Sequence, residues 1–106
     1  MNAVDRNKKV VAVVTGSSSG IGFETSLLLA KNGFFTYATM RNLDKSNKII
    51  DLKLKEKLPL KVLELDVTDD KSVKEAIEKI ANEQGTVDVL VNNAGISLVG
   101  AVEDTR

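Results

Sequence analysis

Cysteine and histidine are both absent from this sequence of 106 residues, and proline occurs only once. Without cysteine, the chain can form neither disulfides nor thiolate metal sites. Without histidine, it lacks the most common general base and the most common metal ligand. The carboxylates are scattered along the chain rather than grouped, so we expect no metal site.

An excess of charge of one sign is also absent, because fifteen basic residues balance fifteen acidic ones. The sequence therefore predicts no basic surface for nucleic acid or for an anionic membrane. The longest apolar runs, Val10–Val14 and Leu27–Ala30, are far too short to cross a bilayer. Residues 1–9 are polar and do not resemble a signal peptide. We therefore expect a soluble cytoplasmic protein.

What the sequence does contain is a regular alternation of two kinds of apolar segment. Short apolar runs rich in β-branched residues, typical of buried strands, alternate with longer segments of helical periodicity. The predicted strands are Val10–Val14, Phe34–Met40, Leu60–Leu65 and Val87–Val91, and the predicted helices follow the glycine-rich residues 16–22 up to Gly33, then span Leu43–Leu58 and residues 68–85. This order predicts an α/β fold in one domain, residues 1–106. Its parallel sheet is of Rossmann type, with strand order 3-2-1-4 and helices on both faces.

Apolar spacing also predicts which side of each helix packs on the sheet. The expected core faces are Ile21, Thr25, Leu28, Leu29 and Asn32 in the first helix; Ile50, Leu54 and Leu58 in the second; and Val73, Ala76, Ile77, Ile80 and Ala81 in the third. Pro59 should stop the second helix, and the hydroxyl of Thr68 could cap the third.

The first predicted strand runs directly into the glycine-rich turn Thr15–Gly22. A pyrophosphate binds well against backbone N–H groups at a helix N-terminus, and glycine allows the backbone to approach it. Gly22 would let the helix pack closely, and three serines add hydroxyl donors. The alternative is a flexible strand–helix connection. A Walker-type phosphate loop is disfavoured, because no Gly-Lys-Ser/Thr follows.

The spacing of Gly16, Gly20 and Gly22, together with Asn92-Asn93-Ala94-Gly95 after the fourth strand, resembles the short-chain dehydrogenase/reductase family. The resemblance covers essentially the whole chain. It implies that the turn residues Gly16, Ser17, Ser18, Ser19, Gly20, Ile21 and Gly22 hold the adenosine side and pyrophosphate of a dinucleotide. It also implies that Asn93, Ala94 and Gly95 line the cofactor site, while Asn92 and Asn93 brace the sheet. A simple strand-end turn is the alternative for the two asparagines.

The end of the second strand indicates which dinucleotide is preferred. NAD-binding Rossmann folds place an acid there to bond the ribose 2′-hydroxyl, but the matching residue here is Met40, and Arg41 follows. A guanidinium can pair with a 2′-phosphate, and the three turn serines could share it, so NADP(H) is favoured over NAD(H). The alternative is an arginine that faces only solvent. By resemblance, Asp66 would bind the adenine amino group and Val67 N–H the ring, although Asp66 could equally turn the chain before the third helix.

The catalytic residues of the family are missing from this sequence. The resemblance calls for Tyr-x-x-x-Lys after a fifth strand, but the single tyrosine, Tyr37, lies on the second strand. It is about 13 Å from Arg41 along a strand, so the two are no catalytic pair. Ser97 could lie near the nicotinamide but lacks a base. We therefore name no catalytic residue.

Two accounts of the chain follow. It is either the NADP(H)-binding portion of an oxidoreductase, truncated after the fourth strand, that acts on a carbonyl or hydroxyl substrate, or a non-catalytic nucleotide-binding or interaction module. A methyltransferase-like fold would want an acid where Met40 and Arg41 stand. An uncovered fourth strand at the sheet edge could cause self-association.

Overall fold

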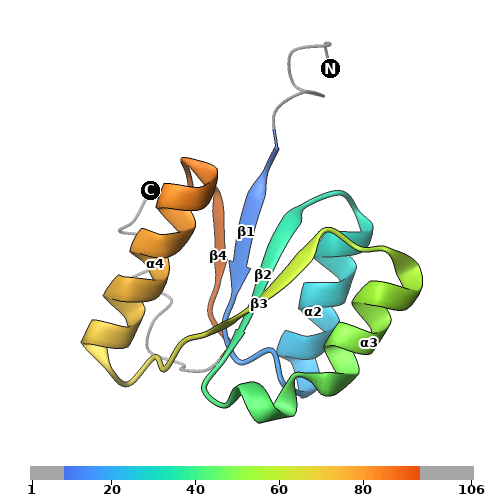
Figure 1. The fold of residues 1–106 in the computed structure, drawn as a ribbon, viewed down its shortest axis with the longest axis horizontal. Helices are drawn as coiled ribbons and strands as arrows, with labels where there is room; N and C mark the ends of the chain where they lie inside the picture. Colours follow the sequence, from blue (N-terminus) through green and yellow to red (C-terminus); the bar gives the residue numbers. More distant parts are fainter. Residues whose placement is uncertain (1–8, 94–106) are drawn as a thin grey trace.

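The computed structural model describes residues 9–93 of the chain as one parallel sheet between two layers of helices (Figure 1). The elements, in chain order, are β1 (Val11–Val14), α2 (Gly20–Lys31), β2 (Phe35–Met40), the short 3₁₀ helix η1 (Leu43–Lys45), α3 (Asn47–Glu56), β3 (Leu60–Glu64), α4 (Asp70–Gln84) and β4 (Val89–Val91). The strand order is β3-β2-β1-β4. The predicted α/β class, strand order and parallel sheet are therefore confirmed.

Strand β1 lies at the centre of the sheet and is buried along its whole length. Val13 is in register with Tyr37 on one side and with Leu90 on the other. The backbone of Val11 also meets Asp88 twice, just before β4: Asp88 N–H donates to Val11 O, and Val11 N–H donates to Asp88 Oδ2, both at 2.9 Å. A continuous β-branched run thus forms the central strand, as its lack of alternation predicts.

The sheet separates two apolar cores. Helices α2 and α3 cover one face, where Phe23, Leu27 and Ile49 pack against Ala38 and Met40. Helix α4 covers the other face, where Ile80 packs against residues of β1 and β2. The prediction that helices lie on both faces is confirmed.

The predicted core face of the first helix is wrong. Ile21 and Leu28 are 75% and 62% exposed, whereas Phe23, Leu27 and Ala30 are buried. Leucines 27–29 are consecutive, and successive side chains of a helix point about 100° apart. The leucines alone therefore do not determine which side of the helix faces the sheet. The bulky ring of Phe23, spaced by four from Leu27 and by seven from Ala30, belongs to the face that packs on the sheet.

The second and third helices also differ in detail from the prediction. The second is divided into η1 and α3, and Leu54 is 67% exposed while Ile49 is buried. Helix α3 ends at Glu56, and its C-cap Lys57 has a left-handed backbone (φ 56°) two residues before Pro59. In the third, Ala76 and Ile80 are buried as predicted, but Ala81 is exposed.

Candidate functional site

The glycine-rich turn joins the carboxyl end of β1 to the N-terminus of α2. Gly16 and Gly20 have positive φ angles of 65° and 62°, which side chains disfavour. Ser19 occupies the N-cap position of α2, but its side chain makes no capping hydrogen bond. The first amides of a helix have no partners within the helix, and its dipole is positive there. An anion such as a pyrophosphate therefore fits this end of α2.

Ser17 does not offer its hydroxyl to a ligand, contrary to the prediction. Its side chain is fully buried, and its hydroxyl donates to Val14 O at 2.9 Å. Its backbone N–H donates to Thr39 O, also at 2.9 Å. Ser17 thus holds the turn against the ends of β1 and β2. Of the other two serines, Ser18 is partly buried and Ser19 is exposed.

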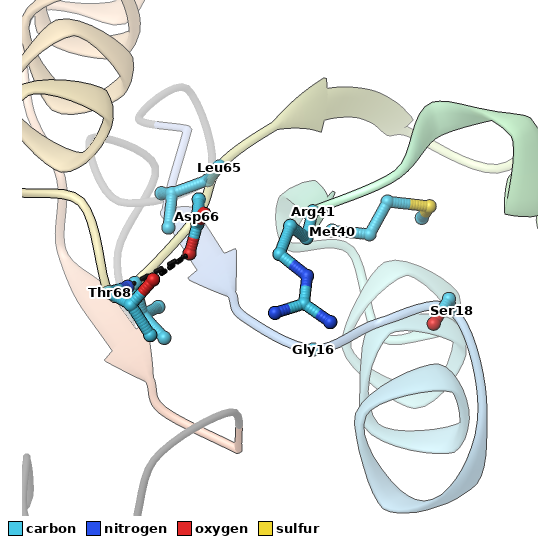
Figure 2. Close-up of a pocket in the computed structure, with 8 residues that line it drawn as sticks. Gly16, Ser18, Met40, Arg41, Leu65, Asp66 and Thr68 are labelled. Atoms are coloured by element: carbon cyan, nitrogen blue, oxygen red, sulfur yellow. Dashed lines mark hydrogen bonds between the residues drawn. The ribbon is translucent and has the colours of Figure 1, made fainter.

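A pocket of about 240 Å³ lies between this turn and the carboxyl ends of β2 and β3 (Figure 2). The residues that line it are Gly16, Ser18, Met40, Arg41, Leu65, Asp66, Val67 and Thr68. Five of these eight are predicted site residues, so the fold brings together segments about 25 residues apart in the chain, as consecutive βα units of a Rossmann fold do. The pocket lies outside the carboxyl ends of the strands, where ligands of open α/β sheets bind.

The two residues at the end of β2 differ sharply in exposure. Met40 is only 2% exposed and belongs to the core beneath α2 and α3. Arg41 is exposed, and its guanidinium extends over the pocket between the turn and Asp66. The position where an acid would meet a ribose is therefore apolar, and the adjoining side chain is a cation.

Asp66 is fixed by the residues that follow it. Its Oδ1 accepts hydrogen bonds from the hydroxyl of Thr68 at 2.7 Å and from Thr68 N–H at 3.0 Å. These two bonds, and to a lesser degree the charge of Arg41, hold the pKa of Asp66 below its ordinary value. The carboxylate therefore stays ionised on the side of the pocket opposite the turn.

The expected capping role of Thr68 is wrong, because its hydroxyl bonds Asp66. Asp69 is the N-cap of α4 instead, and its side chain accepts from the N–H groups of Lys71 and Ser72. The Ser72 hydroxyl in turn accepts from Asp66 N–H at 3.0 Å. A carboxylate at this position serves both as acceptor and as a favourable charge at the positive helix end.

Thr15 connects the start of the turn to the two asparagines after β4. Its hydroxyl accepts from Asn93 N–H at 3.0 Å and donates to Asn92 Oδ1 at 3.1 Å. Thr15 N–H also donates to Val91 O at 2.9 Å. Asn92 thus bonds through its side chain and Asn93 through its backbone, and their common partner is Thr15, which the sequence analysis did not single out. The predicted site residues Ala94 and Gly95, and Ser97 with them, lie outside the described residues.

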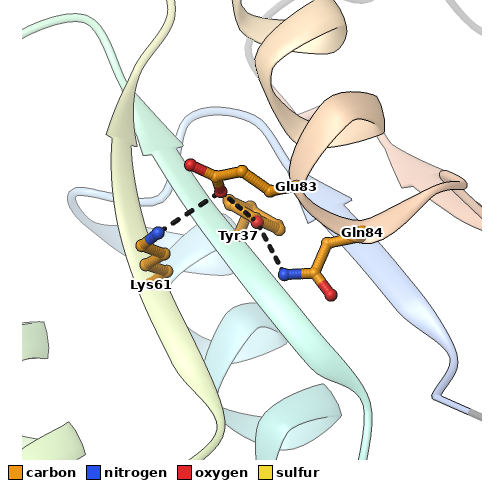
Figure 3. A network of polar contacts seen from close by, with 4 residues as sticks. All are labelled: Tyr37, Lys61, Glu83 and Gln84. Atoms are coloured by element: carbon orange, nitrogen blue, oxygen red, sulfur yellow. Dashed lines mark hydrogen bonds and ion pairs between the residues drawn. The ribbon is translucent and has the colours of Figure 1, made fainter.

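Tyr37 lies in the core beneath α4 (Figure 3) and is not among the residues that line the pocket. Its hydroxyl donates to Glu83 Oε1 at 2.7 Å and accepts from Gln84 Nε2 at 3.1 Å, and Glu83 also pairs with Lys61. The side chain is 1% exposed. Burial, followed by the bond to Glu83, raises the pKa of the Tyr37 phenol. A tyrosine so placed ties α4 to the sheet.

Residues 9–93 contain no cluster of three acidic side chains that could hold a metal ion. Over the same range, no helix combines the length and the hydropathy needed to cross a bilayer.

The profile of the family described as short chain dehydrogenase matches residues 10–106. The chain belongs to this family. It is 39% identical over 93 residues to a 3-ketodihydrosphingosine reductase of Bacteroides thetaiotaomicron and 40% identical over 101 residues to human 17-beta-hydroxysteroid dehydrogenase type 1. The matches cover 88% and 90% of this chain but 31% and 30% of those proteins. The chain thus spans about a third of the length of these relatives.

Solved structures of short-chain dehydrogenases have the same fold. Actinorhodin polyketide ketoreductase with NADPH superposes with a TM-score of 0.76 at 29% identity, over 91% of this chain and 36% of that one. Menthone neomenthol reductase from Mentha piperita gives 0.75 at 30% identity, over 92% of this chain and 38% of that one. The resemblance read from the glycine and asparagine motifs is therefore confirmed.

Sequence reasoning missed several residues of the site. Leu65 and Thr68 line the pocket, and Thr15 joins its turn to the asparagine segment. Thr68 could have been found from its place two residues after Asp66, a spacing typical of Asx turns. Thr15 bonds residues 76 to 78 positions away, and no local pattern predicts such a contact.

Proposed function

We propose that this chain is the NADP(H)-binding portion of a short-chain dehydrogenase/reductase. The observation that carries the proposal is the contrast at the end of β2, where Met40 is buried and Arg41 lies over the pocket. The 2′-phosphate of NADP(H) is a dianion that a guanidinium binds through charge-assisted hydrogen bonds. NAD(H) offers only a hydroxyl at that place, for which a carboxylate is the usual partner.

The described residues fit such a dinucleotide. The uncapped N-terminus of α2 suits the pyrophosphate, and Ser18 faces the same pocket as Arg41 and can share the 2′-phosphate. Asp66 and Val67 line the opposite wall of the pocket and would meet the adenine. Asn93, with Ala94 and Gly95, would follow the cofactor toward its nicotinamide end. When bound, the cofactor supplies the hydride, and the residues named here orient it.

We further propose that the complete protein acts on a carbonyl or hydroxyl substrate. The similar proteins are named as reductases of keto compounds or as hydroxysteroid dehydrogenases, which interconvert these two groups. We assign no substrate-binding residue, because the pocket of the described part is the one that suits the nucleotide.

Fluorescence or calorimetric titration with NADPH and NADH tests the cofactor assignment. We expect the wild-type chain to prefer NADPH by about ten- to a hundredfold, the value of one charge-assisted contact. Arg41→Ala should lose most of this preference by weakening NADPH alone. Lys45→Ala is the matched control, since Lys45 is an exposed cation of η1, four residues after Arg41, that does not line the pocket. Equal affinities in the wild type, or an unchanged preference in Arg41→Ala, would contradict the proposal.

We also propose that the chain associates with itself through the edge of β4. Within the described sheet, β4 pairs with β1 on one side and its residues are half-buried. An exposed strand edge is a template for pairing with another chain.

A further inference from the structure

Three buried hydroxyl groups form one connected network beneath the glycine-rich turn. Ser17 Oγ and Thr39 Oγ1 both donate to the carbonyl of Val14, each at 2.9 Å. Ser26 Oγ lies 2.9 Å from Ser17 Oγ. All three side chains have an exposed fraction of 0%. Burying a hydroxyl group in an apolar core costs free energy unless the group is hydrogen-bonded. The three hydroxyls are therefore held in this arrangement by the bonds that they make.

The direction of the bonds follows from the number of protons. A serine hydroxyl carries one proton, and that of Ser17 is used on the Val14 carbonyl. Ser26 must therefore be the donor in its bond with Ser17. The chain of donation runs from α2 through the turn to the end of β1.

The network also reaches the end of β2. Thr39 bonds both to the end of β1 and to the turn, because its hydroxyl shares the Val14 carbonyl with Ser17 and its own carbonyl accepts from Ser17 N–H at 2.9 Å. Thr39 lies two residues before Arg41 on the same strand end. The backbone that carries Arg41 is thereby tied to the backbone that forms the start of the phosphate-binding turn.

We propose that Thr39 and Ser26 are positioning residues that set the distance between the phosphate-binding turn and the guanidinium of Arg41. The inference rests on the proposed NADP(H) function. A dinucleotide fixes the spacing between its pyrophosphate and its 2′-phosphate. The turn and Arg41 can therefore bind these two groups at once only if the protein holds them at the same spacing. Neither hydroxyl reaches the ligand itself, since both are spent inside the protein. Their effect on binding is therefore exerted through the turn and through Arg41.

Thr39→Val tests the proposal, and Thr36→Val is its matched control. Thr36 lies on the same strand with an exposed fraction of 0%, but at the other end, where its hydroxyl donates to Phe34 O at 2.9 Å. Both variants replace a buried hydroxyl with a methyl group and should lower the melting temperature. Below that temperature, Thr39→Val should lower the affinity for NADPH about three- to tenfold, which corresponds to the free energy of one net hydrogen bond. The affinity for NADH should fall less, because NADH has no 2′-phosphate for Arg41 to bind. The preference for NADPH should therefore fall.

Thr36→Val should leave both affinities unchanged, and Thr39→Ser, which restores the hydroxyl, should recover the wild-type preference. Ser26→Ala removes only the outermost hydroxyl and should lower the preference about two- to threefold; it provides the test if Thr39→Val does not fold. The positioning role, but not the cofactor preference, is overturned if the wild type prefers NADPH and Thr39→Val keeps the same preference. If Thr39→Val does not fold, an unchanged preference in Ser26→Ala has the same meaning. A wild type that binds both dinucleotides equally overturns the proposed cofactor preference and the positioning role with it.

Discussion

A Cβ atom at Gly22 would lie 2.0 Å from the carbonyl oxygen of Gly16 and 2.7 Å from its carbonyl carbon. The first turn of α2 therefore packs directly on the backbone of the turn that precedes it. No side chain fits between them, because backbone atoms of the turn cannot rotate away as a flexible side chain can. Close packing at Gly22, predicted from the glycine spacing, is confirmed by this geometry.

We expect Gly22→Ala to push the turn away from α2. Overpacking of this kind costs about 1–3 kcal/mol of unfolding free energy, and the displaced turn should bind NADPH at least about tenfold more weakly. Gly33→Ala is the control, because Gly33 also has no side chain but nothing lies within 4 Å of a Cβ there. That variant should lose some stability through its positive φ angle and keep its affinity. Normal binding by a folded Gly22→Ala protein would show that the pyrophosphate lies elsewhere.

The lowered pKa of Asp66 makes a prediction about acid stability. A carboxyl group whose pKa is lower in the folded state stabilises the protein above its ordinary value of 3.8, and this contribution disappears as the pH falls through the folded-state pKa. Asp66→Asn should therefore lower the melting temperature at neutral pH, and the difference from wild type should shrink in acid below pH 3.8. Asp51→Asn, which removes an exposed carboxylate of α3 outside the pocket, is the control. A pH-independent difference for Asp66→Asn would contradict the assigned role of its charge.

The hydroxyl of Tyr37 is expected to stabilise the packing of α4 on the sheet. Tyr37→Phe removes the bonds to Glu83 and Gln84 but keeps the ring, which contacts Phe35 edge-to-face. We expect the free energy of unfolding, measured by chemical denaturation, to fall by about 1 kcal/mol. The loss is no larger because Glu83 and Gln84 can form hydrogen bonds with water instead. The raised pKa of this phenol means that its contribution is complete below the ordinary value of 10.0 and is lost as the pH rises through the folded-state pKa. The wild type should therefore lose stability in strong alkali more steeply than Tyr37→Phe, and parallel curves would count against the buried phenol.

The polypeptide of 106 residues should not oxidise NADPH in the presence of aldehydes, ketones or quinones faster than buffer does. It has no histidine, and its one tyrosine is buried under α4. General acid catalysis, worth about 10²–10⁴-fold, therefore has no evident donor among the residues described. The measurement is the loss of reduced-nicotinamide absorbance, with Gly22→Ala as the control for bound cofactor. Turnover that survives repurification and is lost in Gly22→Ala would reveal an acid that we have not identified.

The sheet could be predicted because its signal is distributed over the whole chain. Each strand is a short apolar run bounded by turn residues, and the order of strands and helices leaves few topologies for a parallel sheet. The pocket residues Arg41 and Asp66 were found for the same reason, since both follow strands whose carboxyl ends share one edge.

What sequence reasoning could not assign is the direction in which individual side chains point. Leu27 and Leu28 are identical in type, yet Leu27 packs with Phe23 in the core against the sheet and Leu28 is exposed. Ser17 and Ser18 are likewise identical, yet the twist of the turn directs the first toward Val14 and leaves the second facing the pocket. Such choices depend on tertiary packing, which overrides local preference.

Strand β1 is hydrogen-bonded on both edges and shielded on both faces. Its amides can therefore exchange with solvent only when the whole sheet opens, so they should be among the last to exchange. The glycine-rich turn, which begins at Thr15 directly after β1, is anchored to this slowest-opening part of the domain. Adjustment to an incoming ligand is consequently left to exposed side chains at the pocket, such as that of Arg41, rather than to the start of the turn.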